Sequence, residues 1–236
     1  MSSLRDGLIT YWPLEINSKD KVGGNSGSDT SITYDGEWAI FNGSSSKIFF
    51  SQNLGSYNDI SFFTWIKTSQ TSQGKIIQLS NSTTSFELDV NASAGKLSLT
   101  FYDGTIYRAT TTNSFNDGLE HFVVCVRKGS TLYIYVDNAL EATASTATTT
   151  LTINSANSVL GTHFSVAVYY NGKTKRFGIK NYVLSIQEQT NLFNNGRGLS
   201  YPFIKPNIFK RISKYIGSAT SSFNPAIARR RLLLRK

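Results

Sequence analysis

Residues 117–138 decide the fold, and they read Asp-Gly-Leu-Glu-His-Phe-Val-Val-Cys-Val-Arg-Lys-Gly-Ser-Thr-Leu-Tyr-Ile-Tyr-Val-Asp-Asn. Phe or Val occupies every second position of residues 122–126, and Leu, Ile or Val does so in residues 132–136. Strict alternation over this length predicts half-buried antiparallel strands with these apolar residues in the core. Between them, Gly129 can take the positive φ that a tight turn requires. The stretch therefore predicts a β-hairpin.

Short strand-like segments continue on both sides of the hairpin. They show apolar alternation or many β-branched and aromatic residues, and turn residues separate them. The predicted strands are residues 4–16, 37–41, 47–50, 59–68, 75–79, 85–90, 96–102, 106–111, 141–152 at a sheet edge, 158–161, 164–170 and 176–183. We interpret Asn171-Gly172 as the turn between the last two. Many short strands with turn signals are typical of a β-sandwich.

One short helix is predicted after the last strand. Ser185 and Glu188 form a capping box, in which each side chain satisfies a backbone amide of the first turn. The run continues through Leu192 and Phe193 and stops at Asn194-Asn195-Gly196, which resembles a glycine-type C-cap. A helix of about two turns needs packing against the sheets to be stable.

These segments resemble a known family in their order along the chain. The hairpin, with Asp117-Gly118 and His121 leading into Leu-Tyr-Ile-Tyr-Val-Asp-Asn, is similar to the centre of the laminin-G-like and pentraxin-like jelly rolls. These belong to the concanavalin-A-like lectin and glucanase superfamily. The other similar segments are residues 7–15, 41–48, 61–67 and 177–196. The resemblance implies an all-β, two-sheet antiparallel jelly-roll sandwich with Trp12 and Trp65 in the core.

Charge divides the chain into two parts. The 236 residues carry 24 Lys+Arg and 15 Asp+Glu, a net charge of +9. Residues 203–236 hold nine of the basic residues and no acidic residue, so residues 1–202 are balanced. We therefore predict a jelly-roll domain over residues 1–202 and a basic C-terminal extension over residues 203–236.

The extension combines basic and apolar residues, which a purely solvating tail would not need. It is interpreted as a tail that docks onto a protein partner or a neighbouring copy of the chain, and its end resembles the C-termini of phage structural proteins. The residues predicted to dock are Phe209, Ile212, Ile216, Arg229, Arg230, Arg231, Leu232, Leu233 and Leu234. A third interpretation is nucleic-acid binding, because positive charge attracts phosphates without reading sequence.

The residues do not favour catalysis. Glu87-Leu88-Asp89 resembles the beginning of the Glu-x-Asp-x-x-Glu strand of the superfamily's glucanases, but Ala92 stands at the third acidic position. The carboxylate pair that retaining hydrolysis needs is therefore incomplete. His121 and His163 lie far apart without the spacing of a metal site or a catalytic triad. We predict that the protein is not an enzyme.

Sugar binding needs exposed aromatic faces beside polar side chains. The candidate residues are Trp38, taken to lie at the surface, with Tyr102, Asp103, Tyr107, Tyr169, Tyr170 and Asn171 at two turns. Tyr133 and Tyr135 are expected on the open face of the hairpin. Similar jelly rolls often hold calcium with loop carboxylates, so Asp20, Asp29 and Asp35 are candidate ligands. No other cofactor is expected.

The preferred function is that of a non-enzymatic, lectin-like protein of a virion surface, such as a capsid decoration or tail-fibre protein, anchored by its tail. The alternative is a free carbohydrate-binding protein. An apolar run of about 18 residues, which a membrane-spanning helix needs, does not occur. The N-terminus has no apolar signal region, and Cys125 is the one cysteine. We therefore expect the protein on a virion or released from a cytoplasm.

Overall fold

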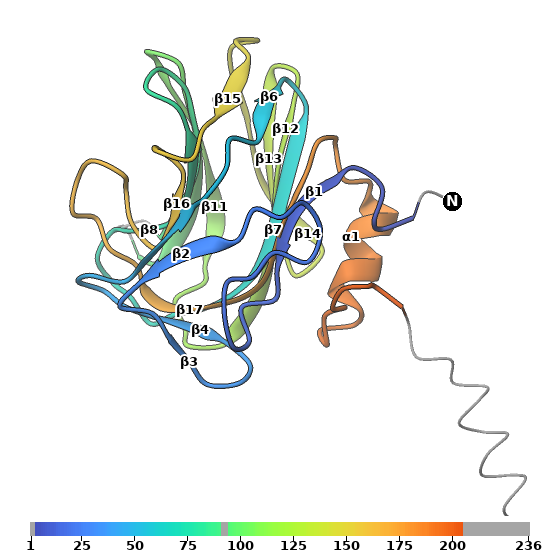
Figure 1. Cartoon of the computed structure of the whole chain (residues 1–236). Helices are drawn as coiled ribbons and strands as arrows, with labels where there is room; N and C mark the ends of the chain where they lie inside the picture. The colour runs from blue at the N-terminus through green and yellow to red at the C-terminus, as the bar shows by residue number, and fades with distance from the viewer. Residues whose placement is uncertain (1–2, 91–93, 205–236) are drawn as a thin grey trace, which may run out of the picture. The chain divides into compact units, whose positions relative to one another are not determined.

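Two large antiparallel sheets form a sandwich in the computed structural model, which describes residues 3–90 and 94–204 (Figure 1). The β12 sheet has the order β14 (Ala139–Ser145), β13 (Thr131–Val136), β12 (Glu120–Lys128), β7 (Ile60–Lys67), β17 (Asn171–Lys180), β4 (Ala39–Asn42) and β3 (Thr33–Tyr34), and β1 (Leu8–Trp12) also pairs with β17. The β9 sheet has the order β11 (Ile106–Ser114), β10 (Lys96–Tyr102), β9 (Ser85–Val90), β8 (Gly74–Ser80), β16 (Val159–Leu160), β5 (Lys47–Phe50) and β2 (Gly27–Thr30). The short strands β6 (Gly55–Tyr57) and β15 (Leu151–Ile153) pair with each other. The predicted jelly-roll sandwich is confirmed.

The central hairpin forms where the sequence predicts it. Strands β12 and β13 pair antiparallel, with Lys128 opposite Thr131 across the turn. Gly129 has φ +53°, the conformation for which glycine is suited. Strand β7 pairs along the other side of β12, so the hairpin lies inside the sheet. Trp12 and Trp65 are both buried, as the resemblance implies.

Strand β12 is buried on both faces, which the sequence analysis did not predict. Val123 and Cys125 face the other sheet and pack in the main core with Ile134 of β13. Phe122, Val124 and Val126, the set assigned to that core, lie on the outer side in a second apolar cluster. Alternation identifies which residues share a face, but not which face meets the other sheet.

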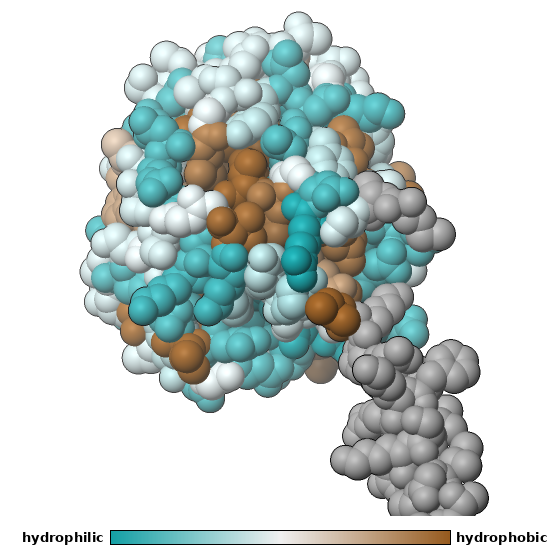
Figure 2. All heavy atoms as spheres, turned by 45° about the vertical axis from the view of Figure 1, so that its right-hand side comes forward, coloured by the Kyte–Doolittle hydropathy of each residue, from teal (hydrophilic) through white to brown (hydrophobic). Residues whose placement is uncertain are grey.

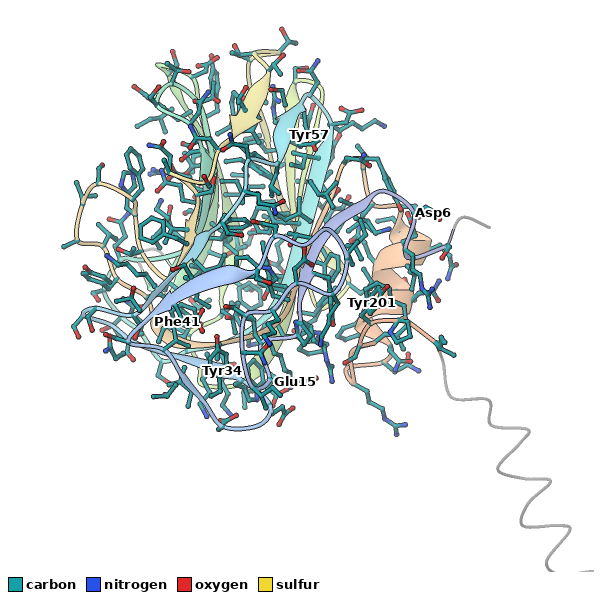
Figure 3. The ribbon with its side chains drawn as sticks, viewed as in Figure 1. Asp6, Glu15, Tyr34, Phe41, Tyr57 and Tyr201 are labelled. Atoms are coloured by element: carbon teal, nitrogen blue, oxygen red, sulfur yellow. The ribbon has the colours of Figure 1, made fainter. Side chains whose placement is uncertain are left out.

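The second cluster exists because helix α1 (Ile186–Phe193) and the segment after it cover the outer face of the β12 sheet (Figure 1). The Phe193 ring stacks on Trp65 with centroids 5.9 Å apart. Further along, the rings of Tyr201 and Phe203 pack against the ring of Tyr11, with centroids 5.9 and 5.2 Å from its centroid. Figure 3 shows Tyr201 beside α1. The face carrying Tyr133 and Tyr135 is therefore half-buried rather than open.

The helix has the predicted start and a modified end. The Ser185 hydroxyl accepts a hydrogen bond from the amide of Glu188, and the Glu188 carboxylate accepts one from the amide of Ser185. Asn194, with φ 49°, is the C-cap where a glycine-type stop was predicted. Asparagine tolerates this left-handed conformation better than most other residues do.

Two predicted elements at residues 164–172 are wrong. Residues 164–170 form a loop, and Asn171 and Gly172 begin β17, where they pair with Asn42 and Phe41. Gly172 is needed for close packing rather than for a turn, because a Cβ atom there would lie 2.4 Å from the ring of Tyr170. Local turn signals do not distinguish these two uses of glycine.

The Thr- and Ala-rich stretch forms the predicted edge strand only in its first half. Strand β14 ends at Ser145, and a loop leads to β15. The guanidinium of Arg127 holds this loop by donating to the carbonyls of Ala147 (3.0 Å) and Thr149 (2.6 Å). It also lies 4.1 Å from the ring of Phe101. The buried Arg127 side chain therefore fixes the position of this loop.

The described surface is not uniformly polar. Figure 2 shows hydrophobic residues gathered near the centre of one face, with hydrophilic residues around them. Large apolar side chains that are exposed include Ile16 and Leu140. Apolar residues are common on protein surfaces, so exposure alone does not define a binding site.

His121 joins the two ends of the hairpin. Its Nδ1 lies 2.8 Å from Asp137, just after β13, and its Nε2 lies 3.1 Å from Asp117, before β12. The hydrogen bond to Asp137, opposed by burial and supported by Asp117, raises the pKa of His121. The protonated ring is therefore favoured in the folded state.

We expect the His121 contacts to stabilise the protein at acidic pH. Because the folded-state pKa is raised, their contribution is complete below the unfolded pKa of about 6.5 and is lost as pH rises through the folded value. Urea unfolding should therefore show a larger loss of stability for His121→Gln at about pH 5.5 than at about pH 8.5.

His163→Gln is the matched control, because burial lowers the pKa of His163 and reverses the sign of its pH dependence. A loss in His121→Gln that is the same at both pH values would contradict the ion-pair account.

Candidate functional site

The outer face of the β9 sheet carries a band of polar residues. Phe86 and Leu88 of β9 point into the core, so Ser85, Glu87 and Asp89 point outward. Pairing places Glu87 opposite Thr100 of β10, and Thr100 opposite Arg108 of β11. Alternation along three strands thus brings polar side chains together on one face.

A pocket of about 320 Å³ opens on this face. The strands β8, β9, β10 and β11 form one side, and the loop after β16 contributes the other. Its lining includes Glu87, Tyr102, Ile106, Arg108, His163 and Phe164. Residues from distant parts of the chain therefore build one concave site.

The rim of the pocket is apolar and accessible. Tyr102 is 41% exposed, Ile106 is 63% exposed and Phe164 is 38% exposed. Tyr102 and Ile106 are cross-strand partners at the end of the β10–β11 hairpin. The ring of His163 stacks on Phe164 with centroids 5.0 Å apart. Aromatic and aliphatic surfaces of this kind can pack against the apolar face of a ligand.

Buried charges lie beneath the rim. The Lys75 ammonium is 2.5 Å from Glu87 Oε2 and 2.5 Å from Asp89 Oδ1, and all three residues are buried. The other oxygen of Glu87 accepts hydrogen bonds from Gln78 (3.1 Å) and Ser85 (2.5 Å). Both carboxylates share one cation, which favours a structural role for them.

The protonation of these groups follows from burial and from Lys75. Burial acts to raise the pKa of Glu87, but the Lys75 ammonium outweighs it and the pKa lies below its usual range. Burial raises the pKa of Asp89 despite the same ammonium. The pKa of Lys75 is raised because the two carboxylates outweigh its burial. The ion pair between Lys75 and Glu87 is therefore favoured.

Three of the predicted sugar-binding residues belong to the β10–β11 hairpin that borders this pocket. Tyr102 lines it, and Asp103 is in the adjoining turn, where its carboxylate accepts hydrogen bonds from Thr149 and Thr105. Tyr107 lies on the opposite face of the sheet, with its ring centroid 6.4 Å from that of Phe101. Only Tyr102 of these three therefore offers its ring to the pocket.

The other predicted sugar-binding residues are placed elsewhere. The prediction of Trp38 at the surface is wrong: it is 4% exposed, and the Lys175 ammonium lies 3.9 Å from the centre of its ring. Tyr170 is fully buried, and Tyr169 is half-buried. Asn171 lines a separate pocket of about 310 Å³. Tyr169, Tyr170 and Asn171 are adjacent in the sequence, but they do not form one binding surface.

Sequence reasoning missed several lining residues. Arg108 could have been found from the Asp103-Gly104 turn, because pairing Tyr102 with Ile106 places Thr100 opposite Arg108. His163 and Phe164 could not, because they belong to a loop: His163 fell between two predicted strands, and Phe164 began a predicted strand that does not form. Their place over the sheet depends on long-range packing.

The three candidate calcium ligands are engaged separately. Asp20 accepts hydrogen bonds from four backbone amides, which makes it the centre of its own loop. Asp29 accepts from Ser18 and Tyr34. Asp35 pairs with Lys173 at 2.9 Å, and this contact lowers its pKa to about 2. In the part of the chain that the structure describes, His, Cys, Asp and Glu form no group of three that could hold a metal.

Some predictions fall outside the described residues. These are Ala92 and the docking residues Phe209, Ile212, Ile216, Arg229, Arg230, Arg231, Leu232, Leu233 and Leu234. In residues 3–90 and 94–204, no helix is long and apolar enough to cross a membrane.

The chain belongs to the concanavalin A-like lectin/glucanases superfamily, because a family model of the laminin G type with that description matches residues 42–188. A comparison with curated proteins found no match.

Solved structures share the fold at low sequence identity. Domain 4 of AbnA, an extracellular arabinanase from Geobacillus stearothermophilus in complex with arabinotriose, is 17% identical with a TM-score of 0.67, covering 78% of this chain and 97% of that one. A heptameric pentraxin from Limulus polyphemus is 14% identical with a TM-score of 0.54, covering 65% and 79%. The binding domain of botulinum neurotoxin DC in complex with SialylT is 15% identical with a TM-score of 0.59, covering 82% and 52%. The chain thus spans about half of that toxin domain.

Lys75→Met should destabilise the protein by about 3–5 kcal/mol at neutral pH, because it leaves two buried carboxylates without their cation. Protonation of Glu87 and Asp89 relieves this cost, so the variant should regain stability as pH falls. Urea unfolding between about pH 4 and about pH 7 measures both effects.

Lys19→Met is the control for charge removal, because Lys19 is exposed. Equal stability of Lys75→Met and the wild type throughout this pH range would contradict the buried-charge account.

Proposed function

We propose that the chain is a non-catalytic, lectin-like carbohydrate-binding module and that the pocket on the outer face of the β9 sheet binds the sugar. The observation that carries this proposal is the exposed apolar rim of Tyr102, Ile106 and Phe164 above polar side chains. A sugar ring offers an apolar face and a periphery of hydroxyl groups, and a pocket with both kinds of surface matches it.

The buried charges favour binding over hydrolysis. A retaining glycosidase needs two carboxyl groups about 5–5.5 Å apart that reach opposite sides of the scissile bond. Glu87 and Asp89 instead both contact Lys75, and Asp89 is 2% exposed. Glu87 lines the pocket but is held by Lys75, and Asp89 is buried behind the lining, so the accessible chemistry lies at the rim.

The structural neighbours support a binding role. The domain of the arabinanase was solved with arabinotriose, and the toxin binding domain was solved with SialylT. Both share the fold with this chain. At 17% and 15% identity they support the class of ligand and leave the particular sugar open.

The more specific role on a virion surface stays a prediction. It requires residues 203–236 to dock onto a protein partner or a neighbouring copy, whereas the alternative of a free carbohydrate-binding protein requires the pocket alone. Nucleic-acid binding by the same basic residues is the third prediction. The predicted location, on a virion or released from a cytoplasm, goes with the virion-surface role.

Tyr102→Ala should weaken glycan binding about fivefold, because loss of one aromatic contact removes about 1 kcal/mol. A glycan array followed by titration calorimetry on the bound glycans measures this. Phe49→Ala is a matched control, because Phe49 is a half-buried aromatic residue on the same sheet outside the pocket.

The thermal midpoints of both variants should remain near that of the wild type. Wild-type protein that binds no glycan at millimolar concentration, or equal weakening by both variants, would contradict the proposed site.

A further inference from the structure

We propose that the pocket selects acidic glycans, and that Arg108 binds the carboxylate of a uronic or similar acidic sugar. This inference rests on the proposed carbohydrate-binding function and specifies its ligand class. It follows from which charges in the pocket are accessible and from the position of Arg108 beside the apolar rim.

The accessible charge in the pocket is positive. The Asp, Glu, His, Lys or Arg residues that line it are Glu87, Arg108 and His163. Glu87 is 8% exposed and is paired with Lys75, and burial lowers the pKa of His163, which favours its neutral form. Arg108 is exposed. A ligand entering the pocket therefore meets a guanidinium as the charged group at its surface.

A neighbouring residue orients the guanidinium of Arg108 and leaves its terminal nitrogens available to a ligand. Its Nε donates a hydrogen bond to Thr100 Oγ1 at 3.1 Å, which fixes the side chain over the polar band. Among the residues that the structure describes, no carboxylate forms an ion pair with it. The two terminal nitrogens are thus in a position to donate a parallel pair of hydrogen bonds, the geometry that a carboxylate accepts best.

The acid that interacts electrostatically with Arg108 is not at the surface. Asp89 influences Arg108 electrostatically, but it is buried against Lys75 and does not line the pocket. The Lys75 ammonium, 2.5 Å from Asp89 Oδ1, compensates the charge of this carboxylate. Asp89 therefore leaves the positive potential at the pocket mouth in place.

The spacing of the rim and the guanidinium fits one sugar residue. Tyr102 faces Ile106 across the hairpin, and Thr100 faces Arg108 one same-side pair further along. Successive same-side residues on a strand are roughly 7 Å apart. A pyranose ring packed on Tyr102 and Ile106 therefore places an exocyclic carboxylate within reach of Arg108. A neutral sugar would use the rim but leave the guanidinium without its preferred partner.

The test compares acidic oligosaccharides with neutral counterparts by titration calorimetry. The probes are oligogalacturonate against its methyl ester and sialyllactose against lactose, in which the carboxylate is masked or absent. Wild-type protein should bind at least one acidic member about tenfold more tightly than its counterpart, because a bidentate arginine–carboxylate contact is among the stronger polar interactions.

Arg108→Gln should remove this preference, so that the acidic member and its neutral counterpart bind with affinities within about twofold of each other. Arg108→Lys should keep part of the preference, because it retains the charge but not the planar fork. Lys96→Gln is the control for loss of a positive charge, because Lys96 lies on β10 of the same sheet outside the pocket. Melting curves report whether each variant folds.

The outcomes separate the two proposals. Glycan binding without preference for the acidic members, or a preference unchanged by Arg108→Gln and Arg108→Lys, would overturn the assignment to Arg108 and leave the carbohydrate-binding function standing. Wild-type protein that binds none of the acidic or neutral probes, and no glycan on an array, would overturn both.

Discussion

Burial of strand β12 on both of its faces is the constraint on which the rest of the structure depends. Val123 and Cys125 fill the space between the sheets, while Phe122, Val124 and Val126 pack under helix α1 and the segment that follows it. Fully burying a large apolar side chain contributes roughly 1.5–3 kcal/mol, so the outer cluster adds substantially to the sandwich core. The short helix is stable because its Leu192 enters this outer cluster.

This arrangement leaves the β9 sheet as the one with a polar outer face. With the helix packed on the β12 sheet, the outward residues of β8, β9, β10 and β11 are covered only in part, by the loop that carries His163 and Phe164. Lys75 makes burial of Glu87 and Asp89 tolerable, and the rim above them stays accessible. The pocket therefore results from the same asymmetry that places the helix.

Local patterns in the sequence were sufficient for the hairpin, most strands and the start of the helix. The alternation in residues 122–136, the Gly129 turn and the Ser185 capping box all depend on neighbours a few positions away, and the structure has each of them. Tyr102 was found in the same way, because an aromatic residue next to an Asp-Gly turn is exposed at the end of a hairpin.

The errors occur where distant residues decide the outcome. The orientation of β12 depends on α1, burial of Trp38 depends on Lys175 of β17, and the role of Gly172 depends on the Tyr170 ring. Arg127 lies two residues before the Gly129 turn, yet it is buried and donates hydrogen bonds to carbonyl groups some 20 residues further along the chain. Local periodicity carries no information on such contacts, and the same reason explains why the loop side of the pocket was missed.

The central claim is that the outer face of the β9 sheet holds a glycan without cleaving it. A crystal structure of the protein with an acidic oligosaccharide tests this most directly. The account predicts an intact sugar chain packed against Tyr102 and Ile106 with its carboxylate at Arg108. A glycan bound at another face of the sandwich, or a cleaved glycosidic bond beside Glu87, would contradict it.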